Sequence, residues 1–302
     1  MKILSLSSMQ IKHLTNVEID YKLWDERLSE CHNQLSYAYT WYLDIVSVGW
    51  EALVSEDYEY IMPLPIKKKY GIPYLVQPIL SQQLGVFSKF PIDNEILNLF
   101  LAKISNISCE IHLNESNFHE NFIPLPNYLL SLTPPYQDLK KSFSKNSVRN
   151  IIKSQSNGLY IHSQMSTDDF LTFYFSNENS FKPSHQPVVK KLIAKGQSQN
   201  LMSLYGVKNA ENDTIAALCV LHSNQRLTYL LPISNAEGKK KCAMFLLVNH
   251  LLQEHAGSNL VFDFEGSMIE GIARFYKGFG AKYQPYFILK RWRPSFLIGK
   301  LN

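Results

Sequence analysis

Two carboxylates near the end of an apolar segment are the first residues whose type and spacing suggest chemistry. Asp263 and Glu265 flank Phe264 in a segment with the composition of a β-strand. Because side chains alternate along a strand, both carboxylates are predicted on one face, with Phe264 opposite. Neighbouring carboxylates raise each other's pKa, which suits a general base. The alternative is a structural pair satisfied by Arg274 and backbone donors.

A lysine-rich turn between an apolar strand and a long helix is a second candidate site. The turn runs from Ser234 to Ala243 and follows the predicted strand 226–233. The first N–H groups of a helix lack partners and lie at the positive end of its dipole, so such a turn can bind a phosphate. The predicted ligands are Ser234, Asn235, Gly238, Lys239 and Lys240. The alternative is a plain lysine-rich first turn, which the helix dipole disfavours.

Basic residues recur on the predicted helix 137–155 and toward the C-terminus. The helix carries Lys141, Lys145, Arg149 and Lys153, whose four-residue spacing places them on one ridge. From Gly271 onward the chain has seven basic residues and no acidic one: Arg274, Lys277, Lys282, Lys290, Arg291, Arg293 and Lys300. We therefore predict that Lys145, Arg149, Arg274 and Lys277 bind an anionic partner such as RNA, a phosphorylated carrier or lipid headgroups. A solvated surface is the alternative.

Composition argues against several other kinds of site. The four cysteines of this 302-residue chain are far apart and form no CxxC motif, which disfavours a disulfide framework or a zinc site. The histidines lack metal-like spacing, and there is no Gly-x-Ser-x-Gly motif of a serine hydrolase. No signal-peptide core or run of ~20 apolar residues occurs. A net charge of +4 is too small to suggest DNA binding.

The elements that must position these residues fall into two halves, predicted as domains 1–135 and 136–302 because Thr133-Pro134-Pro135 interrupts regular structure. The length also fits two domains. In the first half the patterns predict strands at 50–54, 58–66, 72–77, 107–113 and 128–132 and a helix at 93–105. In the second they predict strands at 159–162, 201–207, 214–222, 226–233, 260–264 and 286–292 and helices at 166–175, 187–195, 240–255 and 268–277.

The order of elements in the second half resembles the GNAT (N-acyltransferase) fold over roughly residues 158–292. In that family the turn after the fourth strand donates N–H groups to the pyrophosphate of acyl-CoA. Gly238 matches the first glycine of that turn, whereas Lys240 stands where a second small residue is usual. A family tyrosine placed four residues before a glycine protonates the leaving thiolate, and Tyr276 and Gly280 keep that spacing. The alternative is a tyrosine packed on the sheet.

The whole chain is similar to the FemAB-type branch, which has two GNAT-like domains in tandem. The resemblance rests on Asp263-Phe264-Glu265-Gly266-Ser267, on Phe275 to Gly280 and on the basic segment Lys145 to Ile151. The expected fold class is α/β (α+β): two tandem GNAT-like domains, each a mixed, largely antiparallel sheet flanked by helices. The last strand is expected to pack back toward the first domain.

The resemblance implies an N-acyltransferase without a metal or a permanently bound cofactor. It would transfer an acyl or aminoacyl group from acyl-CoA or aminoacyl-tRNA to the amine of a small molecule or cell-envelope precursor. Tyr276 would be the general acid, and Asp263 or Glu265 would help to deprotonate the amine. The alternative is a non-catalytic GNAT-like module that binds an anionic polymer or lipid-linked envelope precursor. The expected location is the cytoplasm, with peripheral membrane contact and tRNA binding as open options.

Overall fold

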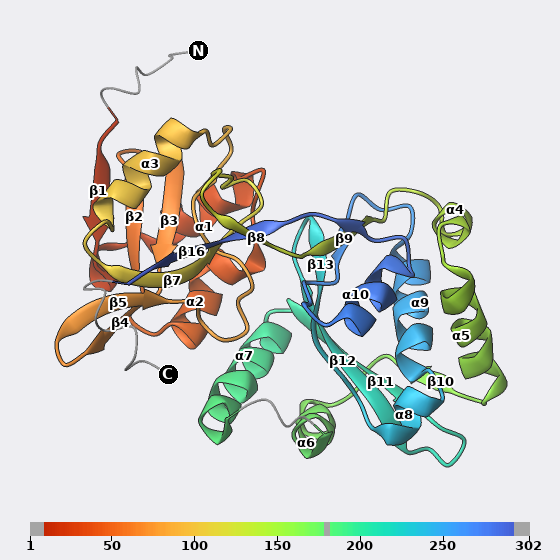
Figure 1. Cartoon of the computed structure of the whole chain (residues 1–302). Coiled ribbons are helices and arrows are strands. Elements are labelled where there is room, and N and C mark those ends of the chain that lie inside the picture. Colours follow the sequence, from red (N-terminus) through yellow and green to blue (C-terminus); the bar gives the residue numbers. More distant parts are fainter. Residues whose placement is uncertain (1–8, 178–181, 293–302) are drawn as a thin grey trace. The chain divides into compact units, whose positions relative to one another are not determined.

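A computed structural model describes residues 9–177 and 182–292, which belong to two compact units (Figure 1). Unit 1 contains the chain up to Leu125 and the segment from Pro285, and unit 2 runs from Pro126 to Gln284. Helices flank mixed sheets in both, which confirms the predicted α+β class. Among the described helices, none is long and apolar enough to cross a bilayer.

Unit 1 contains two sheets. The first has the order β1 (Ile11–Leu14), β2 (Glu51–Ser55), β3 (Tyr60–Leu64) and β6 (Phe87–Ser88). The second has the order β4 (Ile66–Lys69), β5 (Ile72–Val76), β7 (Ser108–Leu113), β16 (Tyr286–Arg291) and β8 (Ile123–Leu125). Lys67, Lys68 and Lys69 lie on β4 at the edge of this sheet, where charged side chains hinder pairing with another strand.

The helices of unit 1 are η2 (Asn16–Glu18), α1 (Tyr21–Glu30), η3 (Ser36–Ala38), α2 (Thr40–Val46) and α3 (Asn94–Lys103). The aromatic residues Tyr37, Trp41 and Tyr42 lie on η3 and α2, and Tyr37 and Tyr42 are buried. On α3, Ile96, Leu97 and Phe100 are buried, and they pack in one apolar cluster with the β-strands. A helix with one such apolar face gains most of its stability from this packing.

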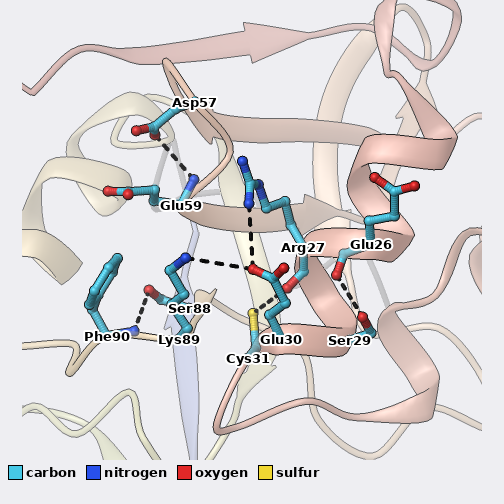
Figure 2. A network of polar contacts seen from close by, with 10 residues as sticks. All are labelled: Glu26, Arg27, Ser29, Glu30, Cys31, Asp57, Glu59, Ser88, Lys89 and Phe90. Atoms are coloured by element: carbon cyan, nitrogen blue, oxygen red, sulfur yellow. Dashed lines mark hydrogen bonds and ion pairs between the residues drawn. The ribbon is translucent and has the colours of Figure 1, made fainter.

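A polar network follows α1 to the short strand β6 (Figure 2). Glu30 lies 3.4 Å from the Nη1 atom of Arg27 and 3.6 Å from the Nζ atom of Lys89. Nearby, the Cys31 thiol donates to the Arg27 carbonyl at 3.2 Å, and the Ser88 hydroxyl accepts from the N–H of Phe90 at 3.0 Å. The ion pairs are partly exposed, so each contributes less than about 1 kcal/mol. The network orders the surface of unit 1 rather than forming a site.

Unit 2 is built on a seven-stranded sheet with helices on both faces (Figure 1). Its strand order is β10 (Tyr160–His162), β11 (Met202–Lys208), β12 (Thr214–His222), β13 (Arg226–Ser234), β14 (Val261–Asp263), β9 (Tyr128–Ser131) and β15 (Lys282–Tyr283). The helices are α4 (Tyr136–Lys141), α5 (Lys145–Ser156), α6 (Thr167–Asn177), η4 (Pro183–His185), α7 (Gln186–Ser198), α8 (Ala236–Lys240), α9 (Ala243–His255) and α10 (Glu270–Lys277). All strands pair antiparallel except β13 and β14, which are parallel.

The division between the units falls before the Thr133-Pro134-Pro135 segment that the sequence favoured. The reason is strand pairing: β9 pairs with β14 and β15 in the sheet of unit 2. The closing strand β16 pairs with β7 and β8 in unit 1. Each unit therefore contains one strand from the other predicted domain: β9 in unit 2 and β16, the last strand, in unit 1.

The predicted basic helix 137–155 is two helices, α4 and α5, and the prediction of one continuous ridge is wrong. The break occurs because the Ser144 side chain accepts from the Ser147 N–H at 3.1 Å and so starts a new helix. Lys141 lies at the end of α4, 2.6 Å from Asp138. Only Lys145, Arg149 and Lys153 share α5.

Candidate functional site

A pocket of about 290 Å³ lies in unit 2, where the end of β13, the second half of α8, the start of α9, and α10 come together. We call it the α9–α10 pocket. Its volume is close to the lower end of the range for small-molecule sites. It is lined by Tyr229, Pro232, Ser234, Gly238, Lys239, Cys242, Met244, Phe245, Gly271, Ile272, Phe275 and Tyr276.

Tyr276 lies on the face of α10 that packs against the sheet. Its ring is 5.0 Å from that of Phe264 and 5.9 Å from that of Tyr229, and only 6% of the residue is exposed. Tyr276 is therefore packed against the sheet, as the alternative interpretation predicted, and it also lines the pocket. Burial, followed by the charges of Glu265 and Asp263, raises the pKa of Tyr276 well above its usual value. The phenol is neutral at neutral pH.

The hydroxyls of Tyr276 and Tyr229 lack hydrogen-bond partners among the residues that the structure describes. Tyr229 is 4% exposed and also lines the pocket. Its pKa is raised mainly by burial and then by Tyr276. Neither oxygen is fully buried, so both can be reached from the pocket that the two residues line. Two unpartnered phenols on one pocket wall therefore indicate a place where a ligand or water completes the hydrogen bonding.

The predicted phosphate turn differs from its expected form, because α8 and α9 are separate helices. Asn235 caps α8 by accepting from the N–H of Gly238 at 2.8 Å, so that N–H is already engaged. A Cβ atom at Gly238 would lie 2.1 Å from the carbonyl oxygen of Ile215. Glycine at this position is thus explained by the close approach of α8 to β12.

The start of α9, not that of α8, has free backbone donors. Cys242 is the residue before α9 and has a left-handed backbone conformation with φ of 59°. Its side chain makes no capping hydrogen bond to the helix. Its own carbonyl accepts from Phe245 N–H, but the N–H groups of Ala243 and Met244 have no acceptor in the described part of the chain. No acidic residue lies in the first turn. This helix start is therefore suited to an anion.

The three lysines of the turn have different surroundings. Lys239 lines the pocket, whereas Lys240 is exposed and lies outside the lining. Lys241 lies 2.7 Å from Glu237, whose carboxylate also accepts from Asn209. The hydrogen bond to Glu237 raises the pKa of Lys241. One lysine of the triplet is thus in a position to meet a ligand in the pocket.

The two predicted carboxylates do not share a strand face. β14 ends at Asp263, and Glu265 has a left-handed φ of 58°, which interrupts the alternation. Asp263 is fully buried: Arg226 Nη1 lies 2.6 Å from Oδ2, and the Glu265 N–H donates to Oδ1 at 2.8 Å. Its partner is Arg226 rather than the expected Arg274, which lies 2.6 Å from Glu270. Both oxygens of Asp263 are engaged, whereas Glu265 is partly exposed.

The predicted substrate-binding cations lie apart from the α9–α10 pocket. Lys145 and Arg149 line an open hollow of about 420 Å³ on α5, together with Phe143, Val148 and Ile152. We call this the α5 hollow. Lys277 Nζ lies 5.5 Å from the centre of the Tyr128 ring, in a cation–π contact. Arg293 and Lys300, part of the predicted basic C-terminus, lie outside the described residues.

The structure thus brings Ser234, Gly238, Lys239 and Tyr276 together but leaves Asn235 and Lys240 out of the lining. Sequence reasoning missed the start of α9 at Cys242. The lysines of the turn were a signal that one helix ends there, since basic residues favour the C-terminal end of a helix. Lys239 and Lys240 indeed lie in the last turn of α8. Within the described residues there is no cluster of three or more His, Cys, Asp and Glu that could hold a metal.

No model of a known protein family matches the sequence, and no curated protein is similar enough to count as a match. Solved structures do match. FemX is 11% identical, with a TM-score of 0.68 over 96% of this chain and 99% of its own. L-PGS from Bacillus licheniformis is 11% identical, with a TM-score of 0.52 over 85% and 88% of the two chains. A tandem GNAT protein from the clavulanic acid biosynthesis pathway is 9% identical, with a TM-score of 0.51 over 92% and 97%. At these identities the likeness establishes the fold alone, which is FemAB-type and tandem GNAT-like.

Proposed function

We propose that the protein is an N-acyltransferase that moves an acyl group from a phosphate-bearing donor, acyl-CoA or aminoacyl-tRNA, to an amine. One observation carries the proposal. The α9–α10 pocket joins a helix start with free N–H groups to a buried tyrosine with a free hydroxyl. The first feature suits a phosphate, and the second suits a leaving group that needs a proton.

The donor phosphate would lie at the start of α9. Of the N–H groups of Ala243 and Met244, that of Met244 belongs to a residue that lines the pocket and can donate to a phosphate oxygen, and Lys239 in the same lining adds a positive charge. No acidic side chain in the first turn of α9 opposes an anion. Binding there would direct the acyl end of the donor toward the phenols of Tyr229 and Tyr276.

The reaction then needs one proton delivered and one removed. The acceptor nitrogen attacks the acyl carbon, and the tetrahedral intermediate expels the sulfur or oxygen of the donor as the C–N bond is kept. Tyr276 gives its proton to that leaving atom, and solvent later restores it. The raised pKa of Tyr276 keeps this proton in place throughout the neutral range. The nitrogen loses its proton to Glu265 or to water.

Glu265 fits the role of base better than Asp263. Both charges act on Tyr276, that of Glu265 more strongly, but Asp263 is fully buried behind Arg226 and the Glu265 N–H, whereas Glu265 is partly exposed. Negative charge beside the phenol would also attract a protonated amine before reaction. The acceptor would be the amine of a small molecule or of a cell-envelope precursor, handled in the cytoplasm or at a membrane surface.

A second candidate function is favoured by the α5 hollow. Lys145, Arg149 and Lys153 are exposed on α5, and no ion pair to them occurs among the described residues. A non-catalytic module could hold an anionic polymer such as RNA, or a lipid-linked precursor, on this face. It would bind such a partner without turning over any acyl donor.

Donor binding is tested by thermal unfolding with acetyl-CoA, longer acyl-CoAs, free CoA and an aminoacyl-tRNA. A ligand at a hundred times its dissociation constant stabilises the folded state by about 2.7 kcal/mol. We expect a rise in melting temperature with at least one donor class. No rise with any of them would exclude a transferase that uses these donors.

Catalysis is tested by Tyr276→Phe, which keeps the ring and removes the hydroxyl. We expect turnover to fall roughly 10²- to 10⁴-fold while donor affinity stays nearly constant. The matched control is Tyr60→Phe in unit 1, a tyrosine that is 7% exposed and whose pKa burial also raises. Equal turnover in the two variants would remove Tyr276 from the mechanism.

A further inference from the structure

The walls of the α9–α10 pocket are strongly apolar. Pro232, Met244, Phe245, Ile272 and Phe275 contribute carbon surface, and the phenol rings of Tyr229 and Tyr276 add more. Lys239 is the one charged residue among those that line it. A transferred group would therefore meet carbon on most sides and a positive charge at one wall.

An aminoacyl group does not fit this chemistry. It carries an α-ammonium whose burial requires a carboxylate or several acceptors. No Asp or Glu lines the pocket, and Lys239 and the positive end of α9 repel a cation. A phenol oxygen can accept one hydrogen bond from an ammonium, but it does not neutralise the charge.

The two carboxylates that act on Tyr276 do not remove this difficulty. Asp263 is fully buried behind its contacts with Arg226 and the N–H of Glu265. Glu265 does not line the pocket, although its charge reaches the Tyr276 hydroxyl. Neither carboxylate is therefore among the residues that an ammonium inside the pocket would contact.

The apolar surface continues outward from the pocket. Ile272, in the lining, is 38% exposed, and Ile269 and Met268 just before α10 are 64% and 80% exposed. Three large apolar side chains in five residues, bordering an apolar pocket, form a surface that an acyl chain could cover. An acetyl group has only three non-hydrogen atoms and would leave most of the 290 Å³ unfilled.

From these contacts we propose that the α9–α10 pocket selects an uncharged, apolar acyl group longer than acetyl and rejects an aminoacyl group. This inference rests on the proposed transferase function and names the class of group that is transferred. Ile272, at the exposed edge of the pocket, is the residue that sets the preference.

The first measurement uses calorimetry with hydrolysis-resistant ketone analogues of acyl-CoA. Isobutyryl and alanyl groups have nearly the same shape and differ by a methyl in place of an ammonium. We expect the isobutyryl analogue to bind at least tenfold more tightly than the alanyl analogue. From acetyl to hexanoyl, each added methylene should lower the dissociation constant about fourfold. Equal or tighter binding of the alanyl analogue would overturn the inference.

A single substitution should reverse the preference. Ile272→Glu places a carboxylate at the pocket edge, and a glutamate in the first turn of α10 suits the helix dipole. We expect the alanyl analogue to bind this variant at least as tightly as the isobutyryl analogue. Ile272→Gln, equal in shape and uncharged, should not show the reversal. Far-ultraviolet circular dichroism and melting temperature confirm that both variants fold.

The outcomes separate the two proposals. If all CoA compounds bind with one affinity regardless of the acyl group, the selectivity is refuted and the transferase proposal stands. If none binds, free CoA included, and the protein also fails to bind aminoacyl-tRNA, the transferase proposal falls and this inference falls with it.

Discussion

The two units each contain a parallel strand–helix–strand crossover, and the starts of the two crossover helices differ in capping and charge. In unit 1 the chain passes from β5 through α3 to β7, and in unit 2 from β13 through α8 and α9 to β14. Asp93 caps α3 by accepting from the N–H of Ile96 at 2.9 Å, and Glu95 lies in its first turn. Cys242 gives α9 no side-chain cap, and the first turn has no acid.

This difference decides where an anion can bind. At α3 a carboxylate already occupies a helix N–H, and two negative charges oppose a phosphate. At α9 the donors are free and the dipole is not offset by a side chain. Equal topology therefore does not mean equal function, which depends on a few residues at the helix start. The predictions on Gly238, Cys242 and Asp93 below change these helix starts or the segment just before α9.

The largest expected effect concerns Gly238, the glycine that lets α8 lie close to β12 just before α9 begins. Gly238→Ala would place a Cβ atom 2.1 Å from the Ile215 carbonyl oxygen, a backbone atom that cannot move cheaply. We expect a loss of roughly 3 kcal/mol in unfolding free energy, measured by urea denaturation. The control is Gly271→Ala, since a Cβ there meets nothing within 4 Å and lies in a helix. It should cost nothing or add up to about 1 kcal/mol. Similar losses in both variants would show that the tight contact is absent.

A smaller effect is expected when α9 is made to resemble α3. Cys242→Asp adds a carboxylate cap, and aspartate tolerates the left-handed conformation of this residue. We expect donor affinity to fall about tenfold, while the protein becomes more stable by about 1 kcal/mol. Cys242→Asn supplies the cap without the charge and should weaken donor binding less.

The reciprocal change in unit 1 completes this test. Asp93→Ala removes the α3 cap and should cost about 1 kcal/mol of stability with no change in donor affinity. If Cys242→Asp leaves donor affinity unchanged, or Asp93→Ala alters it, the assignment of the anion site to unit 2 is wrong.

The sequence predicted most elements of unit 2 because each has a strong local pattern. The meander β11 to β13 and the apolar helix α9 follow from periodicity and turn residues alone. The strands β1, β6, β8 and β15 have weaker patterns, because their pairing partners are far away in the chain. The pairing of β9 in unit 2 is non-local in the same way, whereas the resemblance to tandem GNAT-like proteins led us to expect the last strand, β16, beside the first domain.

The candidate site was predictable in part. The spacing of Tyr276 and Gly280 singled out the tyrosine, and the pattern of the lysine-rich turn singled out Ser234, Gly238 and Lys239. All four residues line the same pocket. The break at Cys242 was not predicted: the lysines were a signal for the end of α8, but a left-handed cysteine has no sequence signature that would mark the start of α9. The pairing of Asp263 with Arg226 also escaped prediction, because 37 residues separate them and only the sheet brings them together.

The smallest expected effect compares one buried histidine from each unit as pH falls. Burial lowers the pKa of His112 in unit 1, although its Nδ1 atom contacts the Gln82 carbonyl oxygen at 3.0 Å and Glu110 lies near. Burial and then His255 lower the pKa of His222 in unit 2, against the opposing charge of Glu254, and its Nε2 atom is unpartnered. For both histidines, the unfolded chain takes up a proton at a higher pH than the folded chain does. Their contribution to stability is therefore complete above pH ~6.5 and is lost as pH falls below it.

The described residues give the Nε2 atom of His222 no hydrogen bond that would offset its burial. We therefore expect His222→Gln to reduce the acid-induced fall in melting temperature between pH 7.5 and 5 more than His112→Gln does. The opposite order would show that the hydrogen bond of His112, which its protonated form can also make, does not moderate its response to acid.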